Sequence, residues 1–122
     1  MENYYTIIAR TLDGLSGMFQ VRLNPECKIY EGHFPGTPVS PGVCNIQMML
    51  ECAEIVAHMP LRARKINRCR FTTLLSPKTH PELEIRIDLQ EKENNIYSLN
   101  ASIGKGEEIY QTLKAELISD EQ

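Results

Sequence analysis

Hydrophobic and polar residues alternate along several stretches of the chain, and each such stretch predicts a β-strand. The clearest are three stretches in the C-terminal half. Their expected buried residues are Leu83, Ile85, Ile87 and Leu89 in the first, Tyr97, Leu99, Ala101 and Ile103 in the second, and Ile109, Leu113, Ala115 and Leu117 in the third. Residues 93–95 and 104–106 supply turns, so these strands should form an antiparallel meander.

Earlier in the chain, residues 4–12 and 16–23 are predicted to form a hairpin around Asp13-Gly14, and the segment 62–71 is expected to add a strand. Residues 24–40 contain several prolines and glycines, which exclude a regular element. A loop of this length inside a compact domain is usually functional.

One helix is predicted from Pro41 to about Met59. Ser40 is a suitable N-cap, Pro41 suits the first helical position, and Pro60 cannot continue the helix. Apolar residues cover most of its circumference, so the helix has to be enclosed nearly all round. A narrow polar stripe is the main exception, formed by Gln47, Glu51, Glu54 and His58. The predicted fold class is α+β, a curled antiparallel sheet wrapped around one central helix, in a single domain spanning residues 1–122.

Composition and charge argue against a few classes of function but do not indicate a particular one. The chain has 13 Lys and Arg against 16 Asp and Glu, a net charge of −3 that gives no indication of nucleic-acid binding. The four cysteines lack the close spacing of a zinc site, so free thiols are expected. The first residues have no signal-peptide pattern, and no apolar run is long enough for a membrane span, so we expect a cytoplasmic protein with no membrane partner.

Residues 32–43 read GHFPGTPVSPGV and carry the most specific information in the chain. This stretch resembles the GHFPGxPVxPGV motif of the 3-hydroxyacyl-(acyl carrier protein) dehydratases at every fixed position, and residues 66–71 are similar to the strand of that family that ends in Arg-Phe. The resemblance implies a hot-dog fold, dehydration of a carrier-bound 3-hydroxyacyl thioester to the trans-2-enoyl thioester, and no metal or dissociable cofactor, since the acyl group is carried on phosphopantetheine.

The chemistry of the motif agrees with this role. Gly42 lies in the first helical turn, where unpaired N–H groups and the helix dipole would polarise a thioester carbonyl. His33 can exchange a proton near neutral pH. The resemblance implies that His33 removes the α-proton while the Gly42 N–H stabilises the enolate-like oxygen. It also implies that the substrate is bound by Phe34, Pro35, Gly36, Val39, Pro41 and Val43.

The helix departs from the family at two positions. The family has a Glu or Asp where this chain has Gln47, and a Gln where it has Glu51. An amide cannot act as a general acid, so Gln47 cannot replace the family carboxyl group. Three alternatives remain open: Glu51 supplies the acid, a water held by Gln47 serves, or the protein binds acyl thioesters without dehydrating them.

The resemblance also bears on partners. In the family the motif histidine and the acid come from different subunits, which implies a homodimer or a larger homo-oligomer. Five cations without an intervening acid, Arg62, Arg64, Lys65, Arg68 and Arg70, are either a solvated edge strand or a docking surface for an acidic acyl carrier protein. Besides a dehydratase, two functions stay open: a non-catalytic subunit that binds acyl thioesters or pairs with an active dehydratase, and a thioesterase that uses Glu51 to direct water.

Overall fold

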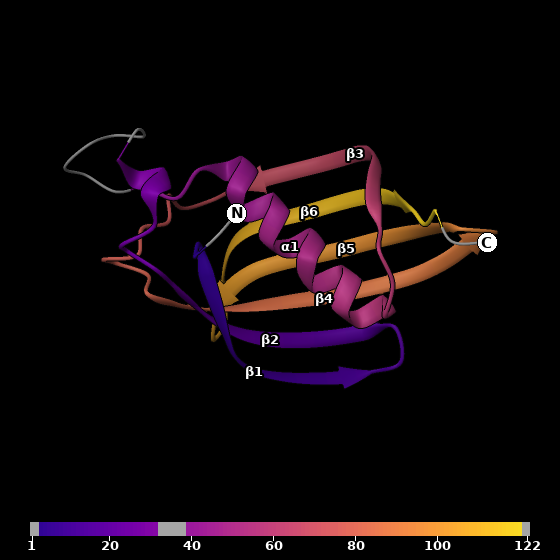
Figure 1. Ribbon diagram of the computed structural model, residues 1–122, viewed down its shortest axis with the longest axis horizontal. Coiled ribbons are helices and arrows are strands. Elements are labelled where there is room, and N and C mark those ends of the chain that lie inside the picture. The colour runs from indigo at the N-terminus through magenta and orange to yellow at the C-terminus, as the bar shows by residue number, and fades with distance from the viewer. Residues whose placement is uncertain (1–2, 32–38, 121–122) are drawn as a thin grey trace.

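The computed structural model describes residues 3–31 and 39–120. One antiparallel sheet contains six strands in the order β1-β2-β4-β5-β6-β3, and α1 lies across one of its faces (Figure 1). The elements are β1 (Tyr5–Asp13), β2 (Ser16–Leu23), the short 3-10 helix η1 (Lys28–Tyr30), α1 (Gly42–Ala57), β3 (Arg62–Phe71), β4 (Glu82–Glu93), β5 (Ile96–Lys105) and β6 (Glu108–Ile118). The predicted α+β architecture is confirmed.

The hairpins turn where the sequence predicts. Gly14, Asn95 and Gly106 have φ values of +59°, +67° and +61°, in the left-handed region that glycine and asparagine tolerate best. The strands β4, β5 and β6 pair consecutively as the expected meander, and β2 pairs with β4 on its other side. The remaining strand, β3, pairs with β6 and forms one edge of the sheet, while β1 forms the other.

The inner face of the sheet and the helix form the core. Met48 and Cys52 of α1 are fully buried, and the helix packs mainly against β4. The predicted enclosure of the helix is incomplete within one chain, because Val43 in the first turn is 75% exposed. No helix in the described part of the chain is long and apolar enough to cross a membrane.

The inward positions of β4 and β5 are confirmed, but one predicted for β6 is wrong. Ile109 is 55% exposed, whereas Tyr110 and Gln111 are buried. The cause is a register shift that pairs Gln111 with Ile103 but Ile109 with Gly104, so Gln111 stays on the inner face and Ile109 turns to the outer face. Strict alternation therefore fails at the start of β6.

Candidate functional site

The chain enters α1 through a segment that is fixed on two sides. The backbone N–H of Ser40 donates to the carbonyl of Leu75 at 2.7 Å, and its hydroxyl lies 3.1 Å from the hydroxyl of Tyr30. Ser40 is thus buried and does not cap the helix as predicted; Pro41 occupies the N-cap position and the first helical residue is Gly42. The helix therefore begins one residue later than expected, because the Ser40 hydroxyl is used by Tyr30.

At the start of α1 the first backbone N–H groups have no acceptor within the helix, as the predicted role of Gly42 requires. The N–H groups of Cys44 and Asn45 donate to the Pro41 carbonyl, whereas those of Gly42 and Val43 lie too early in α1 to have an acceptor within the helix. The absence of a side chain at Gly42 has a second reason that the sequence did not reveal. A Cβ atom there would lie 2.6 Å from the Phe71 ring, which reaches the helix from the end of β3.

The polar stripe of α1 is organised around Glu51. The hydroxyl of Tyr5 donates to Glu51 Oε1 at 2.8 Å, and Gln47 Nε2 donates to Glu51 Oε2 at 3.3 Å. Glu51 is half-buried, while Gln47 is exposed. The exchanged pair thus forms one connected group in which the carboxyl is oriented by the amide and by a tyrosine from β1.

Tyr5 is a neutral donor in this group. Burial, and secondly the hydrogen bond with Glu51, raise the pKa of Tyr5 above its usual value near 10. The adjacent Cys52 lies beneath the stripe, where burial raises the pKa of its thiol to about 12. Cys52 therefore remains a thiol at neutral pH and is not a nucleophile.

A buried polar chain fixes the rotation of the helix start. The Tyr4 hydroxyl donates to Asn45 Oδ1 at 2.7 Å, and Asn45 Nδ2 donates to Gln111 Oε1 at 3.1 Å. Gln111 in turn contacts the Cys69 sulfur at 3.6 Å. Because a buried amide without partners is costly, this chain links the residue before β1 with α1, β6 and β3 at one defined helix orientation.

The structure describes only some of the other predicted site residues. His33, Phe34, Pro35 and Gly36 lie outside the described residues, so their roles stay predictions. Val39 and Pro41 are half-buried beside the helix start, and Val43 is exposed. Within residues 3–31 and 39–120, no three or more His, Cys, Asp or Glu side chains come close enough to hold a metal ion.

The arginines of the basic segment in β3 differ in their surroundings. Arg62 and Arg64 form ion pairs with Asp120 at 3.1 Å and Glu116 at 3.5 Å. Arg68 and Arg70 instead line a groove on the outer face of the sheet, opposite α1. Docking of a carrier protein on this segment remains a prediction.

The sequence analysis predicted no role for four residues of this region: Tyr5, Asn45, Phe71 and Gln111. Each acts through a contact with a residue distant in the chain, such as the pair Tyr5 and Glu51. One signal was present in the sequence, because a lone asparagine on an otherwise apolar helix face requires a buried partner.

Comparison with known proteins identifies the family of this chain. The family model described as ApeI-like, ApeI dehydratase, matches residues 11–111, which is most of the chain. The chain belongs to the ApeI-like dehydratase family. The match begins in β1 and ends in β6, so it includes the helix with its Gly42 start and the polar pair Gln47 and Glu51.

Curated relatives of this ApeI-like chain are also named as dehydratases. A 3-hydroxyacyl-[acyl-carrier-protein] dehydratase FabZ from Pelotomaculum thermopropionicum is 31% identical over 87 residues, which cover 66% of this chain and 61% of the relative. A FabZ from Legionella pneumophila is 26% identical over 74 residues, covering 52% of this chain and 49% of the relative. The chain thus spans about half to three fifths of the length of these relatives.

Solved structures confirm the hot-dog fold of this ApeI-like protein. The dehydratase heterocomplex ApeI:P from Xenorhabdus doucetiae matches with a TM-score of 0.74 and 22% identity, over 93% of this chain and 96% of that chain. A protein from Erwinia carotovora subsp. atroseptica matches with a TM-score of 0.65 and 18% identity, over 95% and 97% of the two chains. At these identities the likeness establishes the fold alone.

Proposed function

We propose that this protein dehydrates 3-hydroxyacyl thioesters carried by an acyl carrier protein to trans-2-enoyl thioesters, and that Glu51 supplies the acid. The observation that carries the proposal is the geometry of Glu51, a half-buried carboxyl oriented by Tyr5 and Gln47 on the helix that begins at Gly42. Family membership and the FabZ relatives support the reaction class.

In the proposed reaction, the thioester carbonyl accepts a hydrogen bond from the Gly42 N–H at the positive end of α1. His33 takes the α-proton, and the electron pair of the broken C–H bond forms the new double bond. The C3–O bond breaks as Glu51, in its protonated form, donates its proton to the leaving hydroxyl, which departs as water. The proton held by His33 then returns to Glu51 through solvent.

We further propose that the site is completed by a second subunit. Exposed apolar side chains gather near the helix start and along the edge strand that reaches it: Val43, Ile66, Phe71 and Leu74. Phe71 joins these two regions, since its ring is 51% exposed yet contacts Gly42. A second hot-dog subunit would cover this surface and bring its own polar stripe toward His33.

Mass spectrometry tests the reaction directly. The protein is incubated with a 3-hydroxyacyl carrier protein and, separately, with the trans-2-enoyl form, because dehydration is reversible. We expect loss of one water in the first reaction and gain of one water in the second. Loss of the acyl group would show a thioesterase, and unchanged acyl groups in both reactions would exclude dehydration by this chain alone.

Mixing two inactive variants tests the shared site. His33→Ala and Glu51→Gln subunits are co-expressed so that mixed dimers form. If the two residues act across the interface, a mixed dimer contains one intact site and recovers up to half of the wild-type rate per dimer. No recovery, with mixed dimers demonstrated, would place both residues in one subunit or remove one of them from catalysis.

A second candidate function is favoured by the amide at position 47. The solved relative from Xenorhabdus doucetiae is a heterocomplex, so a hot-dog subunit of this family can work beside a different one. In that case this chain would bind the acyl thioester and its partner would supply the carboxyl group. Binding of an acylated carrier protein without conversion, and conversion only after a partner subunit is added, would support this alternative over the first.

A further inference from the structure

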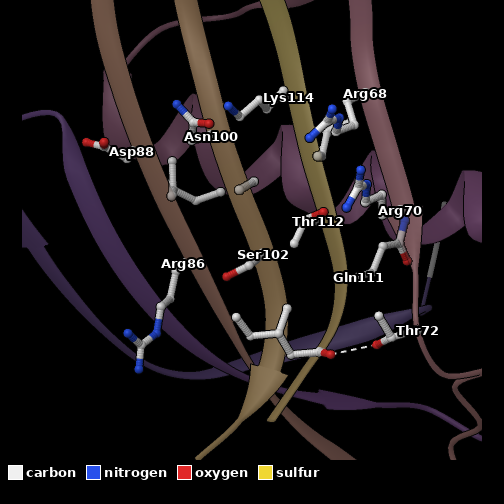
Figure 2. A pocket seen from close by; sticks show the side chains of 14 residues that line it. Arg68, Arg70, Thr72, Arg86, Asp88, Asn100, Ser102, Gln111, Thr112 and Lys114 are labelled. Atoms are coloured by element: carbon white, nitrogen blue, oxygen red, sulfur yellow. Dashed lines mark hydrogen bonds between the residues drawn. The ribbon is translucent and has the colours of Figure 1, made fainter. Parts of the chain in front are cut away.

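We propose that the outer face of the sheet holds a binding site for a phosphate-bearing small molecule, separate from the thioester site. The site is a groove of about 510 Å³ that crosses β3, β6, β5 and β4. Four of its lining residues are cations, Arg68, Arg70, Arg86 and Lys114, and we name it the basic groove (Figure 2).

Strand register places the groove residues in two rows. The first row runs from Arg68 to Lys114, Asn100 and Asp88, and the second runs from Arg70 to Thr112, Ser102 and Arg86. Figure 2 shows Arg68 and Arg70 on the side of β6 that faces β3, with Lys114 extending toward Asn100. Neighbouring strands lie about 4.8 Å apart, so three cations gather at one corner of the groove.

The pairing of Arg68 with Lys114 is unfavourable for the protein alone. Like charges directly opposite each other on neighbouring strands destabilise a sheet. Among the residues that the structure describes, Asp88 is the only carboxylate that lines the groove. It lies two strands from Lys114, or about 10 Å, and accepts a hydrogen bond from the Ser16 hydroxyl. A bound anion would therefore reduce the repulsion between Arg68 and Lys114.

The cations of the basic groove take no part in the ion pairs found among the described residues. Among the described residues, the ion pairs are those of Arg22 with Glu82, Arg62 with Asp120, and Arg64 with Glu116, and none involves a cation of the groove. In the next row along β3, Lys65 lies opposite Glu116. Four cations that form no ion pair with a described residue thus line one groove of a chain whose net charge is −3.

The shape and donors of the groove favour a small phosphate compound over an acidic protein. Its volume lies within the range of about 300–1,000 Å³ typical of small-ligand sites. Neutral donors lie among the charged residues. Thr112 and Ser102 stand between Arg70 and Arg86. Asn100 stands between Lys114 and Asp88. Paired guanidinium groups bind phosphate oxygens through directed hydrogen bonds, and the hydroxyl and amide groups supply further donors.

Binding of inorganic pyrophosphate, measured by isothermal titration calorimetry at low salt, tests this site. Arg68→Gln and Lys114→Gln should each weaken binding about tenfold or more, because each removes a charged hydrogen-bond donor. Arg62→Gln is the matched control, an exposed arginine on the same strand that is already paired with Asp120, and should change the affinity less than about twofold.

Urea unfolding of the ligand-free variants separates a binding role from a structural one. Lys114→Gln should unfold at the same or a higher urea concentration than the wild type, because it removes a like-charge pair. The proposal is overturned if millimolar pyrophosphate does not bind, if Arg62→Gln weakens binding as much as Arg68→Gln, or if Lys114→Gln lowers stability. It is also overturned if only an acidic carrier protein binds and the groove variants abolish that binding.

Discussion

Leu99 and Asn100 are neighbours on β5 but point to opposite faces of the sheet. Leu99 is fully buried on the inner face that packs on α1, whereas Asn100 is exposed and lines the basic groove. The inner face is apolar and closely packed, and the outer face carries unpaired charge. Burial of apolar side chains on the inner face stabilises the fold. We infer that this stability allows the outer face to keep neighbouring like charges, which by themselves destabilise the sheet.

The largest expected effect distinguishes the two faces directly. Leu99→Ala removes a fully buried side chain and should lower the free energy of unfolding by about 2–5 kcal/mol. The adjacent substitution Asn100→Ala should change it by less than about 0.5 kcal/mol. Urea unfolding of both variants measures the difference, and similar losses for the two would contradict the assignment of the faces.

A smaller effect is expected where the inner face meets the start of α1. Gly42→Ala brings a methyl group against the Phe71 ring and should cost less than about 1 kcal/mol, because the half-exposed ring can move aside. Phe71→Ala removes the obstacle, so the double variant should recover part of the loss that Gly42→Ala causes alone. Strictly additive losses in this double-mutant cycle would show that the two residues do not interact.

The smallest expected effect concerns the tyrosines that border α1. Burial raises the pKa of Tyr4, Tyr5 and Tyr30, so the folded protein retains protons that the unfolded chain releases above about pH 10. The resulting stability is present below that pH and is lost as the pH rises further. Urea unfolding between about pH 8 and 11 should show a shallower decline for Tyr5→Phe than for the wild type. Equal declines would contradict a role for Tyr5.

The elements of the fold were predictable because they depend on local patterns. Alternating residues identified β4 and β5, and Gly14, Asn95 and Gly106 marked the turns. Ile109 was misplaced because the register shift in β6 has no signature in the sequence. The Ser40 cap was misassigned because the hydroxyl meets Tyr30, a contact that only the folded chain creates.

The candidate sites were predictable only in part. The motif and the exchanged pair Gln47 and Glu51 can be read from the sequence, but the hydrogen bond from Tyr5 joins residues from β1 and α1. The basic groove was not predicted because Arg68 meets Lys114 only when β3 pairs with β6. The sequence identifies residues with reactive or charged side chains, whereas the pairing of the strands determines which of these side chains become neighbours.

The rate of 3-hydroxyacyl thioester dehydration in Glu51→Gln, compared with Gln47→Ala, tests the central claim most directly. Glu51→Gln removes the proposed acid and should reduce the rate by a factor on the order of 10²–10⁴. Gln47→Ala removes one of two hydrogen bonds that orient Glu51 and should reduce the rate much less. A full rate in Glu51→Gln, or a large gain in Gln47→Glu, would contradict the account and would identify position 47 as the acid position.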